Sequence, residues 1–131
     1  MAKMAEPLRR WKVVCIANNE FVCPPWWRAY NNFGPYKIDK IMRARKTLGG
    51  YSYGFHVFAT RKAARADLVK WRRGTYSPVT LGRLCVIRVE IPLGAKCLGD
   101  GNGFSMRYSR MRIPPDQSAI RRLLRLRRVK P

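Results

Sequence analysis

The only histidine of the chain, His56, stands in an apolar run, and its neighbours decide whether it can do acid–base chemistry. A catalytic histidine is normally oriented by an acid or paired with a nucleophile. The residues two positions away, Gly54 and Phe58, provide neither group. On an alternating strand His56 shares a face with Phe58 and lies opposite Phe55 and Val57. We therefore expect a partly buried histidine that packs on aromatic rings, and we predict no catalytic residue.

Metal chemistry is the second possibility, since the chain contains Cys15, Cys23, Cys85 and Cys97. Their spacing includes no Cys-x-x-Cys pair, and one histidine is too few to complete a zinc site. Thiols within apolar strands behave as small buried hydrophobes. The sequence predicts no metal site and no cofactor.

The charge is the strongest functional signal. Twenty-eight Lys and Arg residues face seven acids, which gives a formal net charge of +21. Such an excess favours an anionic partner, and arginine suits bidentate contacts to phosphate. No base-reading motif accompanies the cations, so we expect sequence-independent contact with a nucleic-acid backbone, or contact with an anionic membrane surface, and no small-molecule substrate. The predicted anion-binding residues are Arg43, Arg45, Arg61, Lys62, Arg72, Arg73, Arg107, Arg110, Arg121, Arg122, Arg125 and Arg128.

Two apolar groups are predicted interface residues for larger protein subunits. Trp26 and Trp27 follow a Pro-Pro pair and suit a protein interface, base stacking, a bilayer headgroup layer or simple core packing. Ile120, Leu123 and Leu124 form the apolar stripe of a basic C-terminal helix. That stripe must dock on its own domain, on a neighbouring subunit or on a membrane.

The N-terminal half of the chain predicts three strands before the histidine run. They span residues 11–17, 20–23 and 36–45, the last with Tyr36, Ile38, Lys40 and Met42 on one face. The run "GFHVFA" predicts a buried strand. Thr60 then caps a helix over residues 61–73, whose apolar stripe contains Ala64, Leu68 and Trp71.

The C-terminal half predicts two further strands and a final helix. Residues 83–91 alternate clearly, and residues 104–113 alternate with a phase change near Ser109 that indicates a bulge. Asp116 is suited to cap a helix over residues 117–128.

These elements predict an α+β fold with a small, mainly antiparallel sheet, one packed helix and a basic C-terminal helix. The expected divisions are a basic arm over residues 1–10, an α+β domain over residues 11–115 and a basic amphipathic helix over residues 116–131. The expected core is a single cluster made of Phe55, Phe58, Leu68, Trp71, Ile87 and Val89.

The order of these elements resembles a family of small uncharacterised domains of large DNA viruses and phages. The family core Gly-(Ile/Phe)-His-x-Phe-x-Thr matches here from Gly54 to Thr60, and Arg61 and Ala64 continue the match. The similarity covers residues 35–113. Lys62 and Ala63 replace the acids of the family pattern, and Asp39 replaces its usual glycine. The resemblance implies a viral or phage origin.

A second stretch is similar to ADP-ribosyltransferase domains, in which a Gly-x-x-Phe-Ala strand enters a helix. Those enzymes also require an upstream His-Gly pair and a downstream catalytic Glu. The chain has no histidine before His56, and Glu90 lies in no matching context.

The leading hypothesis is a non-enzymatic minor capsid or internal virion component that joins larger subunits to an anionic surface. The alternatives are a sequence-independent nucleic-acid-binding protein and an ADP-ribosyltransferase-like enzyme. No secretory signal and no run of about eighteen apolar residues is present, so we expect location in a virion or host-cell interior, neither secreted nor membrane-spanning.

Overall fold

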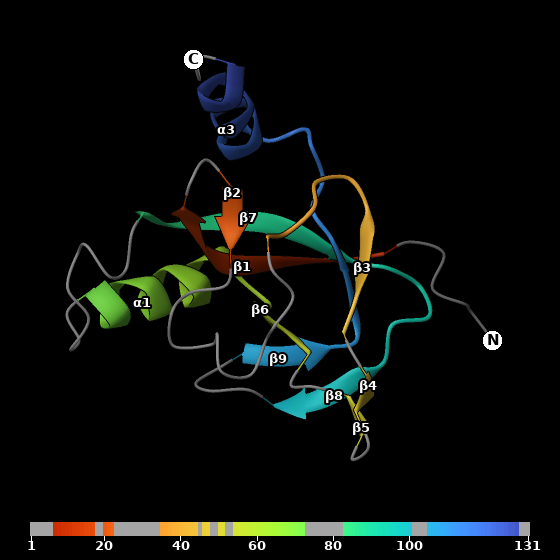
Figure 1. The fold of residues 1–131 in the computed structure, drawn as a ribbon. Helices are drawn as coiled ribbons and strands as arrows, with labels where there is room; N and C mark the ends of the chain where they lie inside the picture. The colour runs from red at the N-terminus through yellow and green to blue at the C-terminus, as the bar shows by residue number, and fades with distance from the viewer. Residues whose placement is uncertain are drawn as a thin grey trace.

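Antiparallel strands make up most of the fold, which a computed structural model describes for residues 7–17, 20–22, 35–44, 46–47, 50–51, 54–72, 83–100 and 105–128 (Figure 1). The predicted α+β class is confirmed. In chain order the elements are β1 (Leu8–Ala17), β2 (Glu20–Val22), β3 (Ile41–Arg43), β4 (Lys46–Thr47), β5 (Gly50–Tyr51), β6 (Phe55–Phe58), α1 (Arg61–Arg72), β7 (Arg83–Ile91), β8 (Cys97–Asp100), β9 (Ser105–Tyr108), β10 (Arg110–Arg112) and α3 (Ser118–Arg128).

The longest ladder joins β1 to β7 and begins within the predicted N-terminal arm. Their register runs from Leu8 opposite Ile91 to Ile16 opposite Arg83. Leu8 also packs against the main core. The predicted boundary at residue 10 is therefore wrong, because residues 8–10 belong to the sheet.

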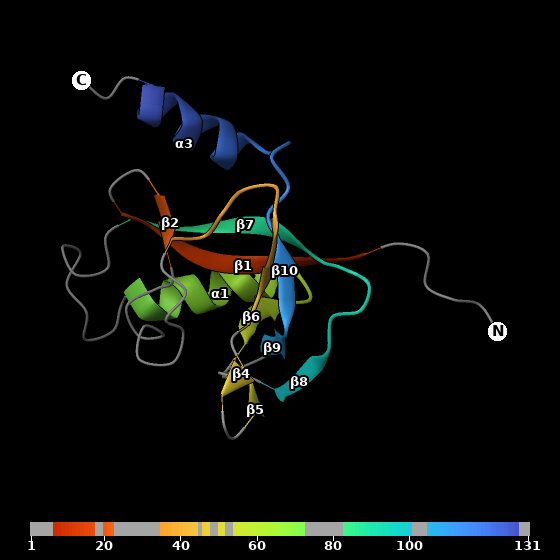
Figure 2. The same cartoon turned by 45° about the vertical axis from the view of Figure 1, so that its right-hand side comes forward.

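The eight-stranded sheet has the order β3-β10-β7-β1-β6-β9-β8, with β2 added beside β1. Only Ser109 separates β9 from β10, yet β9 pairs with β6 and β10 pairs with β7. The two ends of the β7-β1-β6 block are thus joined by one short stretch of chain, and the sheet curls back on itself (Figure 2). The strands β4 and β5 form a separate two-stranded sheet.

Ser109 is the corner at which the chain changes partners. Its hydroxyl accepts a hydrogen bond from Lys96 N at 2.8 Å, and its own N–H donates to Lys96 O at 2.9 Å. Its carbonyl accepts from Ala44 N at 2.8 Å. The phase change predicted near Ser109 is confirmed, but its predicted cause is wrong: the chain changes neighbouring strands there, and the register shift of this region lies in β8 between Cys97 and Gly99.

The core consists of two clusters on opposite faces of the sheet, so the predicted single cluster is wrong. Phe55, Ile87 and Val89 belong to the larger cluster, whereas Phe58 and Leu68 belong to the smaller one under α1. Successive residues of a strand point to opposite faces, which separates Phe55 from Phe58. The predicted contribution of the Trp71 side chain lies outside the described residues.

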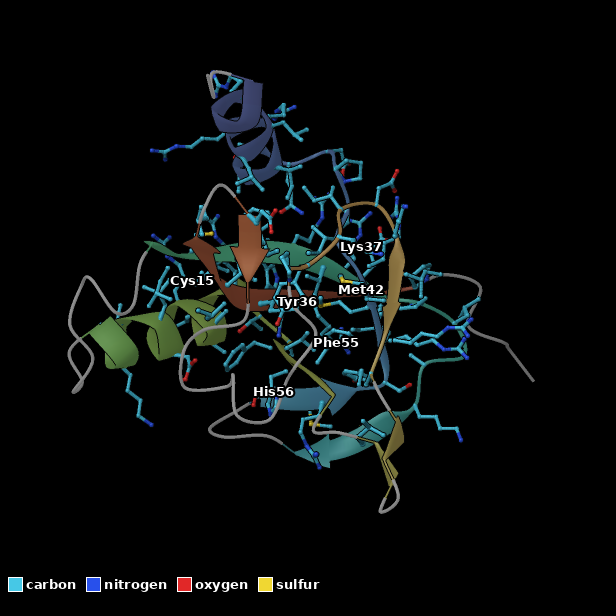
Figure 3. The ribbon with its side chains drawn as sticks, viewed as in Figure 1. Cys15, Tyr36, Lys37, Met42, Phe55 and His56 are labelled. Atoms are coloured by element: carbon cyan, nitrogen blue, oxygen red, sulfur yellow. The ribbon has the colours of Figure 1, made fainter. Side chains whose placement is uncertain are left out.

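Tyr36 and Phe55 lie at the centre of the larger cluster (Figure 3). Their ring centroids are 6.4 Å apart, with the planes tilted by 58°. The predicted strand over residues 36–45 is reduced to β3, because the Tyr36 N–H donates to Phe21 O and the Asp39 N–H donates to Ile113 O. Asp39 also has a φ of 62°, which ends any extended conformation at that residue.

The helix α1 follows its prediction closely. Thr60 Oγ1 accepts a hydrogen bond from Ala63 N at 3.1 Å, as expected of an N-cap. Ala64 and Leu68 are buried against the sheet.

Gly54 directly precedes β6. It has a φ of 76°, and an added Cβ would lie 2.8 Å from Tyr108 O. The backbone therefore requires glycine at this position.

Candidate functional site

The apolar side of α3 is docked on its own domain. Ile120 and Leu123 are fully buried in the larger core cluster, and Ala119 packs against it. The prediction of Ile120 and Leu123 as interface residues for a partner is therefore wrong. The division at residue 116 is also wrong, because α3 contributes to the common core. Leu124 stays 36% exposed.

The turn into α3 is fixed by Gln117 and Asp116. The Gln117 side chain accepts from Arg88 N at 2.9 Å and donates to Arg88 O at 2.8 Å. It replaces a strand partner at the point where Pro114 cannot donate to the ladder. Asp116 does not cap the helix as predicted; it pairs with Arg88 at 2.8 Å, and the Gln117 carbonyl accepts the first helical hydrogen bonds.

Three predicted anion-binding residues, Arg121, Arg122 and Arg125, lie exposed on α3. The first turn of the helix contains no acid. Among the described residues, none of these three arginines takes part in an ion pair. Their guanidinium groups therefore remain available to an external anion.

Two hollows flank this basic face. One, of about 430 Å³, is lined by Ser118, Arg121, Leu124 and Arg125. The other, of about 490 Å³, lies between α3 and the ends of β1 and β7, and Arg122 and Arg125 contribute to its lining. Arg125 borders both hollows.

The ion pairs of the described chain gather elsewhere, around β7 and β10. Arg112 contacts Glu90 at 2.8 Å and also pairs with Asp39. The hydrogen bond to Asp39, aided by Glu90 and opposed by partial burial, raises the pKa of Arg112. These pairs neutralise Arg112, so it does not contribute free positive charge to the surface.

Arg43 and Arg110 lie next to that network and directly opposite each other on β3 and β10. Arg43 is exposed and Arg110 is half-buried. No ion pair joins either residue to an acid among the described residues. Like charges directly opposite in an antiparallel ladder repel each other, and a bound anion would relieve that repulsion.

The predicted cations of the first helix lie on another side of the molecule. Arg61 and Lys62 are exposed on α1, and the Arg61 guanidinium carbon lies 5.8 Å from the centre of the Trp11 ring. In both ribbon views α1 and α3 lie on opposite sides of the β1–β7 pair (Figures 1 and 2). The predicted cations are therefore not gathered in one patch.

Arg107 is placed differently from its prediction. Its side chain is half-buried and donates from Nη2 to Leu98 O at 2.7 Å. This contact gives Arg107 a structural role inside the sheet. The predicted residues Trp26, Trp27, Arg45 and Arg73 lie outside the described residues, as do the side chains of Arg72 and Arg128.

A buried lysine was missed at the sequence level. Lys12 is 3% exposed, its Nζ donates to His56 O at 2.7 Å, and it lies 5.6 Å from the centre of the Tyr36 ring. The sequence pattern that could have indicated its burial is the alternation of Lys12, Val14 and Ile16, which places all three on one face of the first strand.

His56 is buried, as expected of a packing residue, although more completely than predicted. Burial, together with the positive charges of Lys12 and Arg107, lowers its pKa from 6.5 to about 3. The ring is therefore neutral at physiological pH. A base with so low a pKa takes up a proton poorly near pH 7.

Two further findings concern the described part of the chain. No group of three or more His, Cys, Asp or Glu side chains there could hold a metal ion. Neither described helix has the length and apolar character needed to cross a bilayer.

Comparison with protein families, with curated proteins and with solved structures finds no match.

Proposed function

We propose that the protein is a non-enzymatic binding protein that holds the phosphate backbone of nucleic acid without reading its sequence. The observation that supports this proposal is that the two sides of α3 have different surroundings. Its apolar stripe is buried in its own domain, while Arg121, Arg122 and Arg125 are exposed and have no ion-pair partner in the described chain. Guanidinium groups bind phosphate bidentately, and such contacts carry no sequence information.

The spacing of the arginines along α3 suits a polymer that carries a phosphate group at every unit. Arg121 and Arg125 are one helical repeat apart, about 6 Å along the axis. Their side chains therefore project from the same side of α3. The start of the helix at Ser118 adds partial positive charge, and no acid in the first turn cancels it.

An anionic membrane suits α3 less well than nucleic acid does. A helix that lies on a bilayer needs a free apolar face to insert among the lipids. The corresponding face of α3 is occupied, because Ile120 and Leu123 are fully buried. Among the described side chains of the helix, Leu124 is the large apolar residue that remains exposed.

The expected role as a minor capsid or internal virion component, with contacts to larger subunits, stays a prediction. The viral family resemblance and the ADP-ribosyltransferase alternative also stay predictions. Nucleic-acid binding is the part of these hypotheses that the geometry of α3 supports best.

The test is the salt dependence of binding to duplex DNA of mixed sequence. Each phosphate contact contributes about −0.9 to the slope of log K against log salt concentration. Replacing Arg121, Arg122 and Arg125 together with glutamine should therefore flatten the slope by about 2 to 3. The matched control is Lys37→Gln with Lys40→Gln and Arg65→Gln, which removes the same charge from exposed positions that are not among the predicted anion-binding residues.

The control triple should change the slope much less than the α3 triple. Equal flattening by the two variants would show diffuse attraction by the whole surface and would contradict a site on α3. Binding that resists high salt and requires one sequence would contradict the proposed function itself.

A further inference from the structure

The hollow between α3 and the ends of β1 and β7 combines two chemically different walls. Its floor contains Ile16, Leu84 and Cys85, and its α3 side contains Arg122 and Arg125. The volume of about 490 Å³ falls within the range of small-molecule sites. We call this hollow the α3 groove.

The two walls together suit a ligand with a flat apolar part next to a phosphate. The Ile16 side chain and the Cys85 thiol lie on the face of the sheet that α3 covers, and both can contact an aromatic ring without demanding particular hydrogen bonds. The Leu84 side chain packs under α1, so Leu84 borders the groove only at the end of β7. Arg122 and Arg125 are exposed at the same groove and carry uncompensated charge among the described residues. A nucleotide unit has this combination of a planar base and a phosphate.

We propose that the α3 groove accepts one unstacked base of single-stranded nucleic acid, with the adjoining phosphates held by Arg122 and Arg125. This inference rests on the proposed function and adds a preference to it. Phosphate contacts alone give a single strand no advantage over a duplex, whose charge density is higher. The groove can take a base only where the base is free to leave its stack.

A duplex cannot offer its bases in the same way. Its bases are paired and stacked, and turning one out costs unstacking and unpairing energy. Single strands present base faces at no such cost, and stacking of this kind tolerates any base. The protein should therefore bind single strands more tightly than duplexes when the number of phosphates and the salt concentration are equal.

The first experiment compares three ligands with the full chain: a mixed-sequence single strand, a duplex of half its length with the same number of phosphates, and an abasic deoxyribose-phosphate oligomer as long as the single strand. The single strand should bind roughly 5- to 100-fold more tightly than the abasic oligomer, the range expected for one stacked base. Equal affinity for the two would overturn the groove proposal and leave the proposed function standing. Absence of salt-dependent binding to all three would overturn the proposed function.

The second experiment narrows the groove without removing charge. Ala119 lines the groove from α3, and Ala119→Leu fills space there. This variant should lose the advantage of the single strand over the abasic oligomer and keep its affinity for duplex. Ser118→Leu, at an exposed position on the same lining, serves if Ala119→Leu lowers thermal stability. Retention of the full advantage in a folded variant would place the base elsewhere and overturn the proposal.

The alkylation of Cys85 reports directly whether a ligand occupies the α3 groove. It lines the groove, while Cys97 is exposed on β8 and serves as an internal control. Alkylation followed by peptide mass spectrometry should show Cys85 protected by the single strand and Cys97 unprotected. Equal labelling of Cys85 with and without the single strand would count against the proposal. Protection of Cys85 by vesicles of phosphatidylglycerol, and not by the single strand, would assign the groove to lipid.

Discussion

Lys12 and His56 connect β1 to β6 through a hydrogen bond of 2.7 Å from the lysine Nζ to the histidine carbonyl oxygen. The backbone register between these strands is short, with Trp11 opposite Phe58 as its described pair. The ammonium group thus reinforces a narrow strand junction from within the core. It also places a positive charge beside the His56 ring, and this charge helps to keep the ring neutral.

The first prediction concerns acid stability. The unfolded chain protonates His56 near pH 6.5, whereas the folded protein does so only near pH 3. Between these values the unfolded state binds more protons, so the free energy of unfolding must decrease as the pH falls. The full contribution is present above pH 6.5, and its loss is limited to about 1.4 kcal/mol per pH unit.

Urea denaturation at pH 7 and pH 4 measures this effect. The wild-type protein should lose on the order of 2–3 kcal/mol more than His56→Gln over that interval. The same pH dependence in both proteins would contradict the low pKa of His56.

The second prediction uses two neighbouring leucines of α3. Leu123 is fully buried and Leu124 is 36% exposed. Leu123→Ala should lower the free energy of unfolding by about 2–5 kcal/mol, as expected for a large-to-small change in a core. Leu124→Ala should change it by roughly 0.5 kcal/mol or less. Thermal or urea unfolding would test the pair, and similar losses in both variants would contradict the docking of α3.

The third prediction concerns the opposed arginines of β3 and β10. Arg43→Glu replaces a repulsive pair with an attractive one opposite Arg110, so it should stabilise the protein by about 0.2–1 kcal/mol at low salt. The gain should shrink at high salt because the side chain is exposed.

Arg65→Glu is the control, since it makes the same change in net charge at an exposed position on α1, away from β3 and β10. An equal gain from this control would mean that the lower net charge, and not the cross-strand pair, is responsible.

Local sequence patterns predicted those helices and strands that are specified by their own residues and by the residues directly next to them. The alternation of residues 83–91, the apolar run at Phe55–Phe58 and the Thr60 cap each specify one element and agree with β7, β6 and α1. The phase change at Ser109 was also visible, because a reversal of alternation must disturb a ladder.

Long-range contacts account for most of the errors. Nothing near Tyr36 in the sequence indicates that its N–H donates to Phe21 or that Asp39 bonds to Ile113. Leu8 lies within the predicted basic arm, but its register opposite Ile91 depends on a residue 83 positions further along the chain. In the same way, the sequence showed that α3 has an apolar stripe, but it did not show which surface covers that stripe.

The candidate site was predicted in part. The arginines of α3 were identified from charge and helical periodicity, whereas the apolar floor of the α3 groove comes from β1 and β7 and required the fold. The charge pattern also did not indicate that the Arg107 side chain donates to the backbone carbonyl of Leu98, because that contact joins neighbouring strands.

The corner at Ser109 also determines when the protein can fold during synthesis. The segment from Ser105 to Arg112 pairs with β6 and β8 on one side of the corner and with β7 and β3 on the other. A nascent chain on the ribosome cannot complete these ladders until this segment has left the exit tunnel, and Ile120 and Leu123 cover the larger cluster later still. Because pairings between residues distant in sequence form slowly, β1, β6 and β7 must wait with exposed apolar faces and unpaired edges. Early contact with a chaperone or a polyanion would therefore increase the yield of folded protein more than it increases the final stability.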